Sequence, residues 1–342
     1  MARSLRIGIV AAHDAVVPPE RYGGIEWAVS ILAEGLLDAG HEVTLFAAPA
    51  SATTAELVAP GGATGDGDAA LRHVLGAWAA AAELDLVSDH SGLLAAAMAD
   101  ACPVPMVHTV HTPLDGARGE LYRLAARVSR RLRLISVSAI QEGTAPDLPW
   151  VGTCPNALDL DAYPFYEGRR EGYLFFLGRL SPEKGAADAV RVSRKMGLPL
   201  KLAGKMHDRA ERAYFAREVQ PYLGDGIEYL GEVSHEEKVQ LLQRARCTLF
   251  PLAWEEPFGL AILESLACGT PVVAVDRGAV REVIAHGESG IVVESVDDMA
   301  AAVEAAELIE PAACRDHVES RFSEQRMVRA YQDAFDRLLA GA

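Results

Sequence analysis

Several features that mark common protein classes are missing from this chain of 342 residues. Basic residues number 32 against 48 acidic ones, and the formal net charge is −16. That balance argues against nucleic acid or an anionic bilayer as the main partner, because both bind basic surfaces. No apolar run reaches the roughly 18 residues of a membrane-spanning helix, and no signal-peptide core follows Met1. These absences predict a cytoplasmic protein.

Cofactor motifs are missing as well. The chain has neither GxGxxG nor the Walker sequence GxxxxGK[ST], so neither a dinucleotide nor an ATP site is indicated. No DxD pair flanked by apolar strands points to Mn²⁺ or Mg²⁺. The 5 cysteines lack CxxC spacing, which favours small buried side chains in a reducing compartment. We therefore expect no cofactor and no metal.

The hydrophobic pattern predicts an α/β protein of two domains. Half of the residues are hydrophobic, and the length suits two domains that each bury a core. Short apolar runs alternate with helical stretches, which is typical of parallel, doubly wound sheets. We expect a mobile loop at 51–68 and an amphipathic helix at 322–339. The expected strands are 7–11, 42–47, 86–87, 106–110, 134–137, 173–177, 200–203, 227–230, 247–250, 272–275 and 291–293.

The stretch 254–275 has the pattern of a turn, a helix and a strand. This pattern predicts the positions of two carboxylates. Leu260–Ala267 is the expected helix, ended by Gly269 before the strand. Glu256 lies in the preceding turn, whereas Glu264 falls on the apolar face of the helix at about 3.6 residues per turn. A carboxylate on a core-facing stripe is costly unless a polar group meets it.

Two interpretations of Glu264 are open at this point. Vicinal hydroxyls of a sugar would satisfy the carboxylate. A helix N-terminus beside it favours an anionic phosphate, here through the N–H groups of Phe258, Gly259 and Leu260. Alternatively, Glu264 binds no ligand and pairs with an arginine, Arg277 or Arg281. Because Glu256 lies in the adjoining turn, the pattern favours the ligand site.

The loop Gly178–Gly185 carries Arg179 and Lys184 between a predicted strand and a predicted helix. A guanidinium and an ammonium at the C-terminal end of a strand can hold a diphosphate. Because the lysine precedes the last glycine, the loop is not a P-loop. Two solvated basic residues in an exposed loop are the alternative interpretation.

The spacing Glu256-x7-Glu264 and its continuation through Gly278–Ile284 and Gly287–Gly290 closely resemble retaining nucleotide-sugar glycosyltransferases of family 4. The resemblance covers nearly all of the second half and the first half more thinly. It implies the GT-B fold, in which two Rossmann-like doubly wound domains face each other across a cleft and a C-terminal helix crosses back. The expected domains are an acceptor-binding domain at 1–154, a nucleotide-sugar-binding domain at 155–321 and the returning helix at 322–342.

The resemblance also implies roles for single residues, and strand ends near the expected sheet edge add others. The predicted catalytic residues are His111, Glu256, Arg179 and Lys184. Glu256 would orient the sugar, and His111 would hold it from the first domain. The predicted donor-binding residues are Gly23, Gly24, Gly178, Arg179, Lys184, Phe258, Gly259, Leu260 and Glu264, with Glu264 on the ribose. The acceptor-side candidates are His13, Asp14, Asp89 and His90.

The sequence thus predicts transfer of a sugar from a nucleoside diphosphate sugar, a UDP-sugar by family frequency, to an acceptor hydroxyl with retention. The expected acceptor is an antibiotic or another secondary metabolite, and a cell-surface glycan or glycolipid is the alternative. Arginines at 123–133 fit a solvated helix face, with an acceptor-phosphate or membrane patch as the alternative. A monomer or homodimer is expected. An epimerase, a phosphorylase and a two-domain sugar-binding protein without chemistry are the competing classes.

Overall fold

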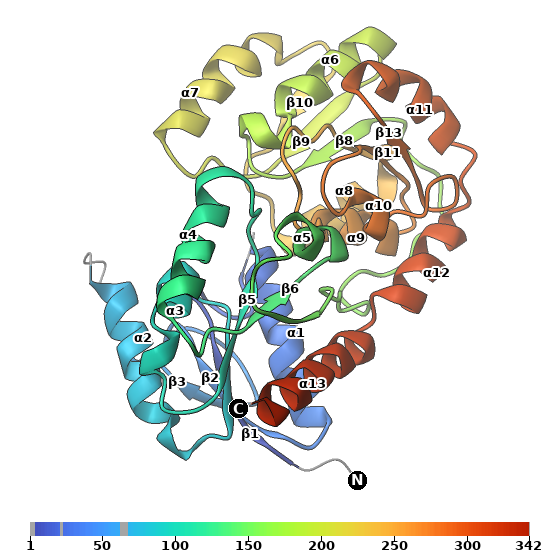
Figure 1. The fold of residues 1–342 in the computed structure, drawn as a ribbon. Helices are drawn as coiled ribbons and strands as arrows, with labels where there is room; N and C mark the ends of the chain where they lie inside the picture. Colours follow the sequence, from blue (N-terminus) through green and yellow to red (C-terminus); the bar gives the residue numbers. More distant parts are fainter. Residues whose placement is uncertain (1–3, 21–22, 62–67, 342) are drawn as a thin grey trace. The chain divides into compact units, whose positions relative to one another are not determined.

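The computed structural model describes residues 4–20, 23–61 and 68–341, which form two compact units. The first unit holds residues 4–19, 23–157 and 324–341, and the second holds residues 20 and 158–323. Each unit is a parallel sheet covered by helices (Figure 1).

The first unit is built on a parallel sheet with the strand order β3-β2-β1-β4-β5-β6-β7. Its strands are β1 (Arg6–Val10), β2 (Glu42–Phe46), β3 (Glu56–Val58), β4 (Leu86–Asp89), β5 (Met106–Val110), β6 (Leu134–Ser136) and β7 (Trp150–Thr153). Its helices are α1 (Gly24–Asp38), α2 (Ala69–Ala80), α3 (Leu93–Ala97), α4 (Gly116–Val128), α5 (Ala139–Thr144) and α13 (Glu324–Ala340), with short 3₁₀ turns η1 (Ala81–Glu83) and η2 (Ala99–Ala101).

Both faces of this sheet are covered, which explains why its strands are continuous apolar runs rather than alternating ones. Side chains from β1 alternate between two core layers: Ile7 and Ile9 pack with α1 and α13, and Val10 packs with α2, α3 and α4. The close contact of α1 with α13 depends on Gly35, because a Cβ there would lie 2.5 Å from a methyl group of Val328.

The second unit has a parallel sheet of order β10-β9-β8-β11-β12-β13. Its strands are β8 (Leu174–Leu177), β9 (Leu200–Ala203), β10 (Ile227–Tyr229), β11 (Cys247–Phe250), β12 (Val272–Val275) and β13 (Gly290–Val293). Its helices are α6 (Ala186–Met196), α7 (Arg209–Glu218), α8 (His235–Arg244), α9 (Leu260–Ala267), α10 (Val280–Val283), α11 (Met299–Ala306) and α12 (Pro311–Arg321), with 3₁₀ turns η3 (Pro182–Lys184), η4 (Gln220–Tyr222) and η5 (Val296–Asp298).

The predicted fold class of two parallel, doubly wound α/β sheets is confirmed. All eleven predicted strands are present, and α9 has the predicted bounds. The predicted loop at 51–68 is wrong in part, because β3 lies inside it and pairs with β2 as an edge strand. Residues 62–67 of that loop lie outside the described residues. The strand β7 was not predicted, because it is only four residues long and all four are only partly buried.

The predicted C-terminal helix returns to the first unit, as the fold class required. It begins at Glu324 rather than at Phe322, because Phe322 lies between α12 and α13 and packs its ring on Phe258 at a centroid distance of 5.7 Å. The predicted apolar face of α13 is confirmed: its residues Met327, Tyr331, Phe335 and Leu338 are all buried.

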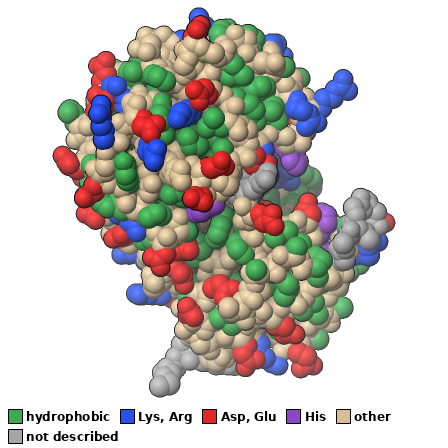
Figure 2. All heavy atoms as spheres, turned by 180° about the vertical axis from the view of Figure 1, so that it is seen from behind, with side chains coloured by type: hydrophobic (Ala, Val, Ile, Leu, Met, Phe, Trp, Pro, Cys, Tyr) green, Lys and Arg blue, Asp and Glu red, His purple; other side chains and the backbone are tan. Residues whose placement is uncertain are grey.

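The surface and the cysteines agree with the composition. Acidic side chains are spread over the face drawn in Figure 2. All 5 cysteines are free and buried, as expected, and burial raises the pKa of the Cys247 thiol to about 12. Within the described residues, no helix is both long enough and apolar enough to cross a membrane.

Candidate functional site

Each sheet has one place where the strand order reverses, and the candidate residues gather there. In the second unit the reversal lies between β8 and β11, which are neighbours in the sheet but far apart in the chain. In an open α/β sheet, ligands bind outside the carboxyl ends of the strands at this point. The loop Gly178–Gly185 follows β8, and the turn with Glu256 follows β11. The topology therefore brings the two predicted motifs of the second half together.

The close approach of these two segments requires a glycine. Gly185 has φ 79°, and a Cβ there would lie 2.0 Å from the carbonyl oxygen of Pro251. No other residue could occupy the position without moving the backbone. At Gly178, by contrast, a Cβ would meet no atom closer than 3.7 Å, so space alone does not require a glycine there.

Lys184 and Glu256 form a direct ion pair. Lys184 Nζ lies 2.5 Å from Glu256 Oε2, and the two side chains are 18% and 10% exposed. Trp254 completes the group, because its indole N–H donates to the same oxygen at 2.9 Å and its ring lies 4.4 Å from Lys184 Nζ. For Lys184, the alternative interpretation of a solvated side chain in an exposed loop is wrong, since this lysine packs against the turn after β11. Sequence reasoning missed Trp254, although it stands two residues before Glu256.

Arg179 is held by two carboxylates of its own unit. It donates to Glu211 Oε1 at 2.7 Å and to Glu183 Oε1 at 2.9 Å. Glu211 is buried in the first turn of α7, where its N–H donates to the Asp208 cap, and the sequence did not link this position to the loop. The spacing of Arg179 and Glu183, four residues apart, was visible in the sequence. The arginine is thus oriented before any ligand binds.

The segment that follows β12 holds the turn that carries Glu256. Gly278 donates its N–H to Glu255 Oε2 at 2.6 Å, and a Cβ on it would lie 2.2 Å from the carbonyl oxygen of Glu256. Helix α9 starts after Gly259, whose φ of 96° is left-handed. The first-turn N–H groups of a helix lack intrahelical partners. Those at Leu260 and the residues next to it therefore remain candidates for a phosphate, with Phe258 buried behind them.

Glu264 has different partners from those proposed in the second interpretation of the sequence. Its Oε1 accepts from Lys238 Nζ at 2.7 Å and from the Tyr163 hydroxyl at 2.5 Å. The specific pairing with Arg277 or Arg281 is wrong, because Arg281 binds Asp276 and Glu294 and Arg277 donates to the carbonyl oxygen of Asp276. No sequence pattern pointed to Lys238, which lies on α8.

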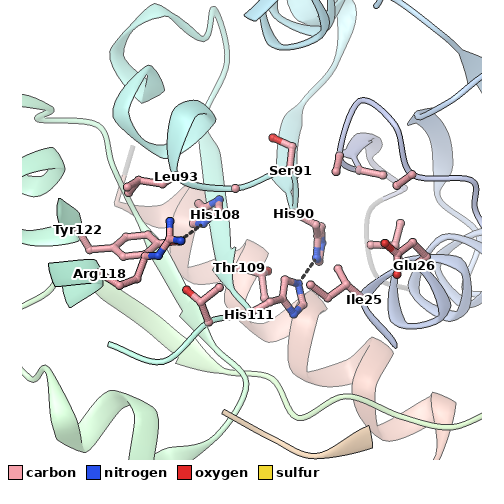
Figure 3. Close-up of a pocket in the computed structure, with 16 residues that line it drawn as sticks. Ile25, Glu26, His90, Ser91, Leu93, His108, Thr109, His111, Arg118 and Tyr122 are labelled. Atoms are coloured by element: carbon pink, nitrogen blue, oxygen red, sulfur yellow. Dashed lines mark hydrogen bonds between the residues drawn. The ribbon is translucent and has the colours of Figure 1, made fainter. Parts of the chain in front are cut away.

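The first unit holds a pocket of about 210 Å³ at its own point of strand reversal, between β1 and β4 (Figure 3). Its walls come from the ends of β1, β4 and β5 and from the starts of α1 and α4. His90 and His111 meet there, with His90 Nδ1 3.0 Å from His111 Nε2. The other ring nitrogen of His90 contacts Ser88 Oγ at 3.1 Å. The lining also includes Ser91, His108, Thr112, Arg118 and Tyr122.

His108 of the lining forms a buried pair with Asp89. His108 Nδ1 contacts Asp89 Oδ2, and its Nε2 lies 2.9 Å from the Tyr122 hydroxyl. Asp89 is fully buried and is not among the residues that line the pocket, so it orients His108 rather than facing a ligand. Among the acceptor-side candidates, His90 is the one that lines the pocket.

Two histidines of the pocket, His90 and His111, have lowered pKa values. Burial, with a smaller contribution from the charge of His108, lowers the pKa of His111 to about 3. Burial and its histidine neighbours lower the pKa of His90 well below the ordinary value. At neutral pH both rings therefore act as hydrogen-bonding groups rather than as cations.

The remaining candidates lie near the start of the chain. Gly23 caps α1 and Gly24 is its first residue. A Cβ on Gly23 would lie 2.8 Å from Pro19, so the helix start is tightly packed. His13 and Asp14 follow β1, with His13 Nδ1 3.7 Å from Asp14 Oδ1. Neither residue lines the pocket. In the described part of the chain, no group of three or more His, Cys, Asp or Glu side chains is arranged to hold a metal ion.

Comparison with known proteins identifies the family. Residues 165–322 match the family described as Glycosyl transferases group 1, and residues 22–145 match Glycosyltransferase Family 4. The phosphatidyl-myo-inositol mannosyltransferase of Mycolicibacterium smegmatis is 30% identical over 339 residues, which cover 87% of this chain and 84% of that protein. The glycogen synthase of Mycobacterium tuberculosis is 31% identical over 265 residues, 68% of this chain and 62% of that protein, so the chain spans less than two thirds of that relative.

Solved structures show the same fold over the whole chain. The glycosyltransferase AviGT4, involved in avilamycin A biosynthesis, superposes with a TM-score of 0.74 at 24% identity over 99% of both chains. Anabaena Alr3699/HepE, solved with UDP and glucose, gives a TM-score of 0.76 at 16% identity over 97% of this chain and 99% of that one. The fold is therefore of the GT-B class. The chain belongs to the group 1 glycosyl transferase family.

Proposed function

We propose that the protein is a retaining, metal-independent glycosyltransferase that uses a nucleoside diphosphate sugar, with UDP as the preferred nucleotide. The observation that carries the proposal is the convergence of Arg179, Lys184 and Glu256 at the reversal point of the second sheet. Two cations beside a carboxylate fit a diphosphate that is linked to a sugar. The name of one structural neighbour, which was solved with UDP and glucose, supports the choice of nucleotide.

In the proposed reaction, the bond between the anomeric carbon and the leaving phosphate oxygen breaks. A bond from the acceptor oxygen to that carbon forms on the same face, and the acceptor's proton moves to the leaving phosphate oxygen. Arg179, Lys184 and the N–H groups at the start of α9 would stabilise the charge that develops on the diphosphate. Glu256 would orient the sugar through its hydroxyls. His111, the predicted catalytic residue of the first unit, would act as a neutral hydrogen-bonding group rather than as a cation, because burial lowers its pKa.

A donor panel tests this proposal. Purified protein is incubated with UDP-, GDP-, ADP- and dTDP-sugars in the presence of EDTA, and released nucleoside diphosphate is measured with and without a cell extract as acceptor source. We expect acceptor-dependent release from a UDP-sugar that chelation leaves unchanged. NMR of the product's anomeric proton then reports retention or inversion. If the protein binds UDP but forms no nucleoside diphosphate from any donor under any condition, it would instead be a sugar-binding protein.

Two acceptor classes are proposed, and one observation favours each. An antibiotic or related metabolite is favoured by the likeness to AviGT4, whose name places it in avilamycin A biosynthesis. A glycolipid is favoured by the relative named phosphatidyl-myo-inositol mannosyltransferase, which matches most of both chains.

The surface of α4 adds support for a lipid acceptor. Leu121, Leu124 and Val128 share one side of this helix and are 45%, 52% and 73% exposed. Arg127 and Arg130 are exposed next to them, whereas Arg123 is paired with Asp147. Vesicles that contain phosphatidylinositol, incubated with the donor that the panel identifies, test this class by the appearance of a glycosylated lipid in mass spectra.

A further inference from the structure

The two carboxylate oxygens of Glu264 have unequal surroundings. Oε1 accepts two hydrogen bonds, from Lys238 Nζ at 2.7 Å and from the Tyr163 hydroxyl at 2.5 Å. In the part of the chain that the structure describes, Oε2 has no hydrogen-bond partner, and it is not among the polar atoms sealed from solvent. One oxygen is therefore held by the protein and the other is available.

The two groups that hold Oε1 are themselves fixed. Tyr163 is buried, its ring stands edge-on to His235 at a centroid distance of 4.9 Å, and its carbonyl oxygen accepts from Arg315 at 2.6 Å. Lys238 also donates to the Tyr163 hydroxyl at 2.9 Å, which closes a triangle of three polar atoms. Burial, together with the charge of Glu264, raises the pKa of Tyr163 well above its ordinary value, so the phenol stays a donor.

Such an arrangement constrains the carboxylate. The ammonium of Lys238 is only 12% exposed and pairs with Glu264 Oε1 at 2.7 Å. The two donors also fix the rotation of the carboxylate, so that Oε2 keeps one direction. A carboxylate oxygen has two acceptor sites, which suits a pair of adjacent hydroxyls. A preorganised acceptor loses less conformational entropy when the ligand binds.

We propose that Lys238 and Tyr163 are positioning residues that aim Glu264 Oε2 at the ribose hydroxyls and thereby make the site selective for ribonucleotides over 2′-deoxyribonucleotides. This inference rests on the proposed function, because it requires Glu264 to receive the ribose. Neither residue contacts the ligand in this scheme, and both act through Glu264.

The test compares the affinity of UDP with that of 2′-deoxy-UDP by calorimetry, in the wild type and in Lys238→Met, Lys238→Arg and Tyr163→Phe. Loss of one hydrogen bond to a charged group weakens binding by about ten-fold or more. The wild type should prefer UDP by about that factor. Lys238→Met and Tyr163→Phe should bring the ratio of the two affinities toward one, and Lys238→Arg should retain the preference because it keeps the charge.

A matched control exists in the same unit. Lys201 lies 4.0 Å from the centre of the Tyr173 ring and 3.9 Å from Glu171, so it belongs to another Lys-Glu-Tyr group that is not at the point of strand reversal. Lys201→Met should leave the ratio as in the wild type. Because the readout is a ratio of two affinities, a general loss of stability does not imitate the expected result.

The outcomes separate the inference from the function that it rests on. If the wild type binds neither UDP nor any other nucleoside diphosphate, the proposed function fails and the inference with it. If the wild type prefers UDP but Lys238→Met and Tyr163→Phe keep the full preference, the positioning role is wrong while the function stands. Should Lys238→Met not fold, Tyr163→Phe decides, since it removes one hydroxyl and leaves the ion pair in place.

Discussion

Lys184 Nζ lies 2.5 Å from Glu256 Oε2, so a cation of the loop after β8 neutralises a carboxylate of the turn after β11. Both side chains are mostly buried, and breaking such a pair from one side leaves an uncompensated charge. A diphosphate that binds to Lys184 has to share it with Glu256. The pair therefore couples the part of the site proposed for the phosphate to the part proposed for the sugar.

Substitution of Glu256 tests this coupling. Glu256→Gln keeps the shape of the side chain and its acceptor for Trp254, but it removes the charge that competes for Lys184. We expect free UDP to bind at least as tightly as in the wild type, while turnover falls by roughly ten- to a hundred-fold because the sugar loses a charged contact. Calorimetry with UDP and a steady-state rate assay measure the two effects.

Lys184→Met is the complementary variant. It removes the cation and leaves Glu256 buried without it, so both UDP affinity and the melting temperature should fall. If Glu256→Gln weakened UDP binding as much as Lys184→Met does, the separation between a phosphate part and a sugar part would be wrong.

Arg179 should contribute to nucleotide binding, beyond any contribution to the structure of its loop. Arg179→Ala removes a guanidinium that Glu183 and Glu211 orient, and UDP binding should weaken by about 1.5–3 kcal/mol. Arg191→Ala is the matched control, because Arg191 also pairs with a carboxylate, Asp188, but is 64% exposed. Equal UDP affinities in the two variants would remove Arg179 from the site.

The positions of the candidate motifs could be predicted from the sequence because they depend on local patterns. The strand at 247–250, the helix Leu260–Ala267 and the strand at 272–275 each have the apolar period of one element and are bounded by glycine or proline. The parallel order then places the ends of β8 and β11 side by side. Glu256 and Lys184 converge for that reason.

The partners of those residues could not be predicted, because they come from elements that only the tertiary fold brings close. Lys238 lies on α8 and Glu211 on α7, and nothing in their local sequence connects them to Glu264 or Arg179. The edge strand β3 was missed for a related reason: three residues in a stretch rich in Ala and Thr form a strand only because β2 offers a free edge.

The two glutamates should differ when free UDP is the ligand. Glu264→Gln loses the charge that would receive the ribose hydroxyls, so UDP should bind about ten-fold or more weakly. Glu256→Gln should not show this loss, because its charge is proposed to face the sugar and not the nucleotide. Circular dichroism confirms that both variants are folded. Unfolding of Glu264→Gln alone would favour a purely structural ion pair with Lys238.

Stability should depend on pH through the buried histidines of the first unit. The pKa of His90 is well below the ordinary 6.5 in the folded protein, so below pH 6.5 the unfolded chain binds a proton that the folded chain does not. The folded state therefore loses stability as the pH falls below 6.5, with a slope that approaches about 1.4 kcal/mol per pH unit for this residue. Denaturant unfolding of the wild type and of His90→Gln between about pH 7.5 and about pH 5 should show a shallower decline in the variant. Parallel declines would mean that His90 titrates alike in both states.

Trp254 offers a direct optical probe of the Lys184–Glu256 pair. Its indole N–H donates to Glu256 and its ring faces Lys184 at 4.4 Å, so a ligand that draws Lys184 away changes the surroundings of the indole. We expect the tryptophan emission of the wild type to change on addition of UDP and this change to be absent in Trp254→Phe. Because phenylalanine keeps a ring for the lysine, the variant should still bind UDP by calorimetry. If Trp254→Phe showed the same fluorescence change on addition of UDP as the wild type, UDP binding would not alter the surroundings of Trp254.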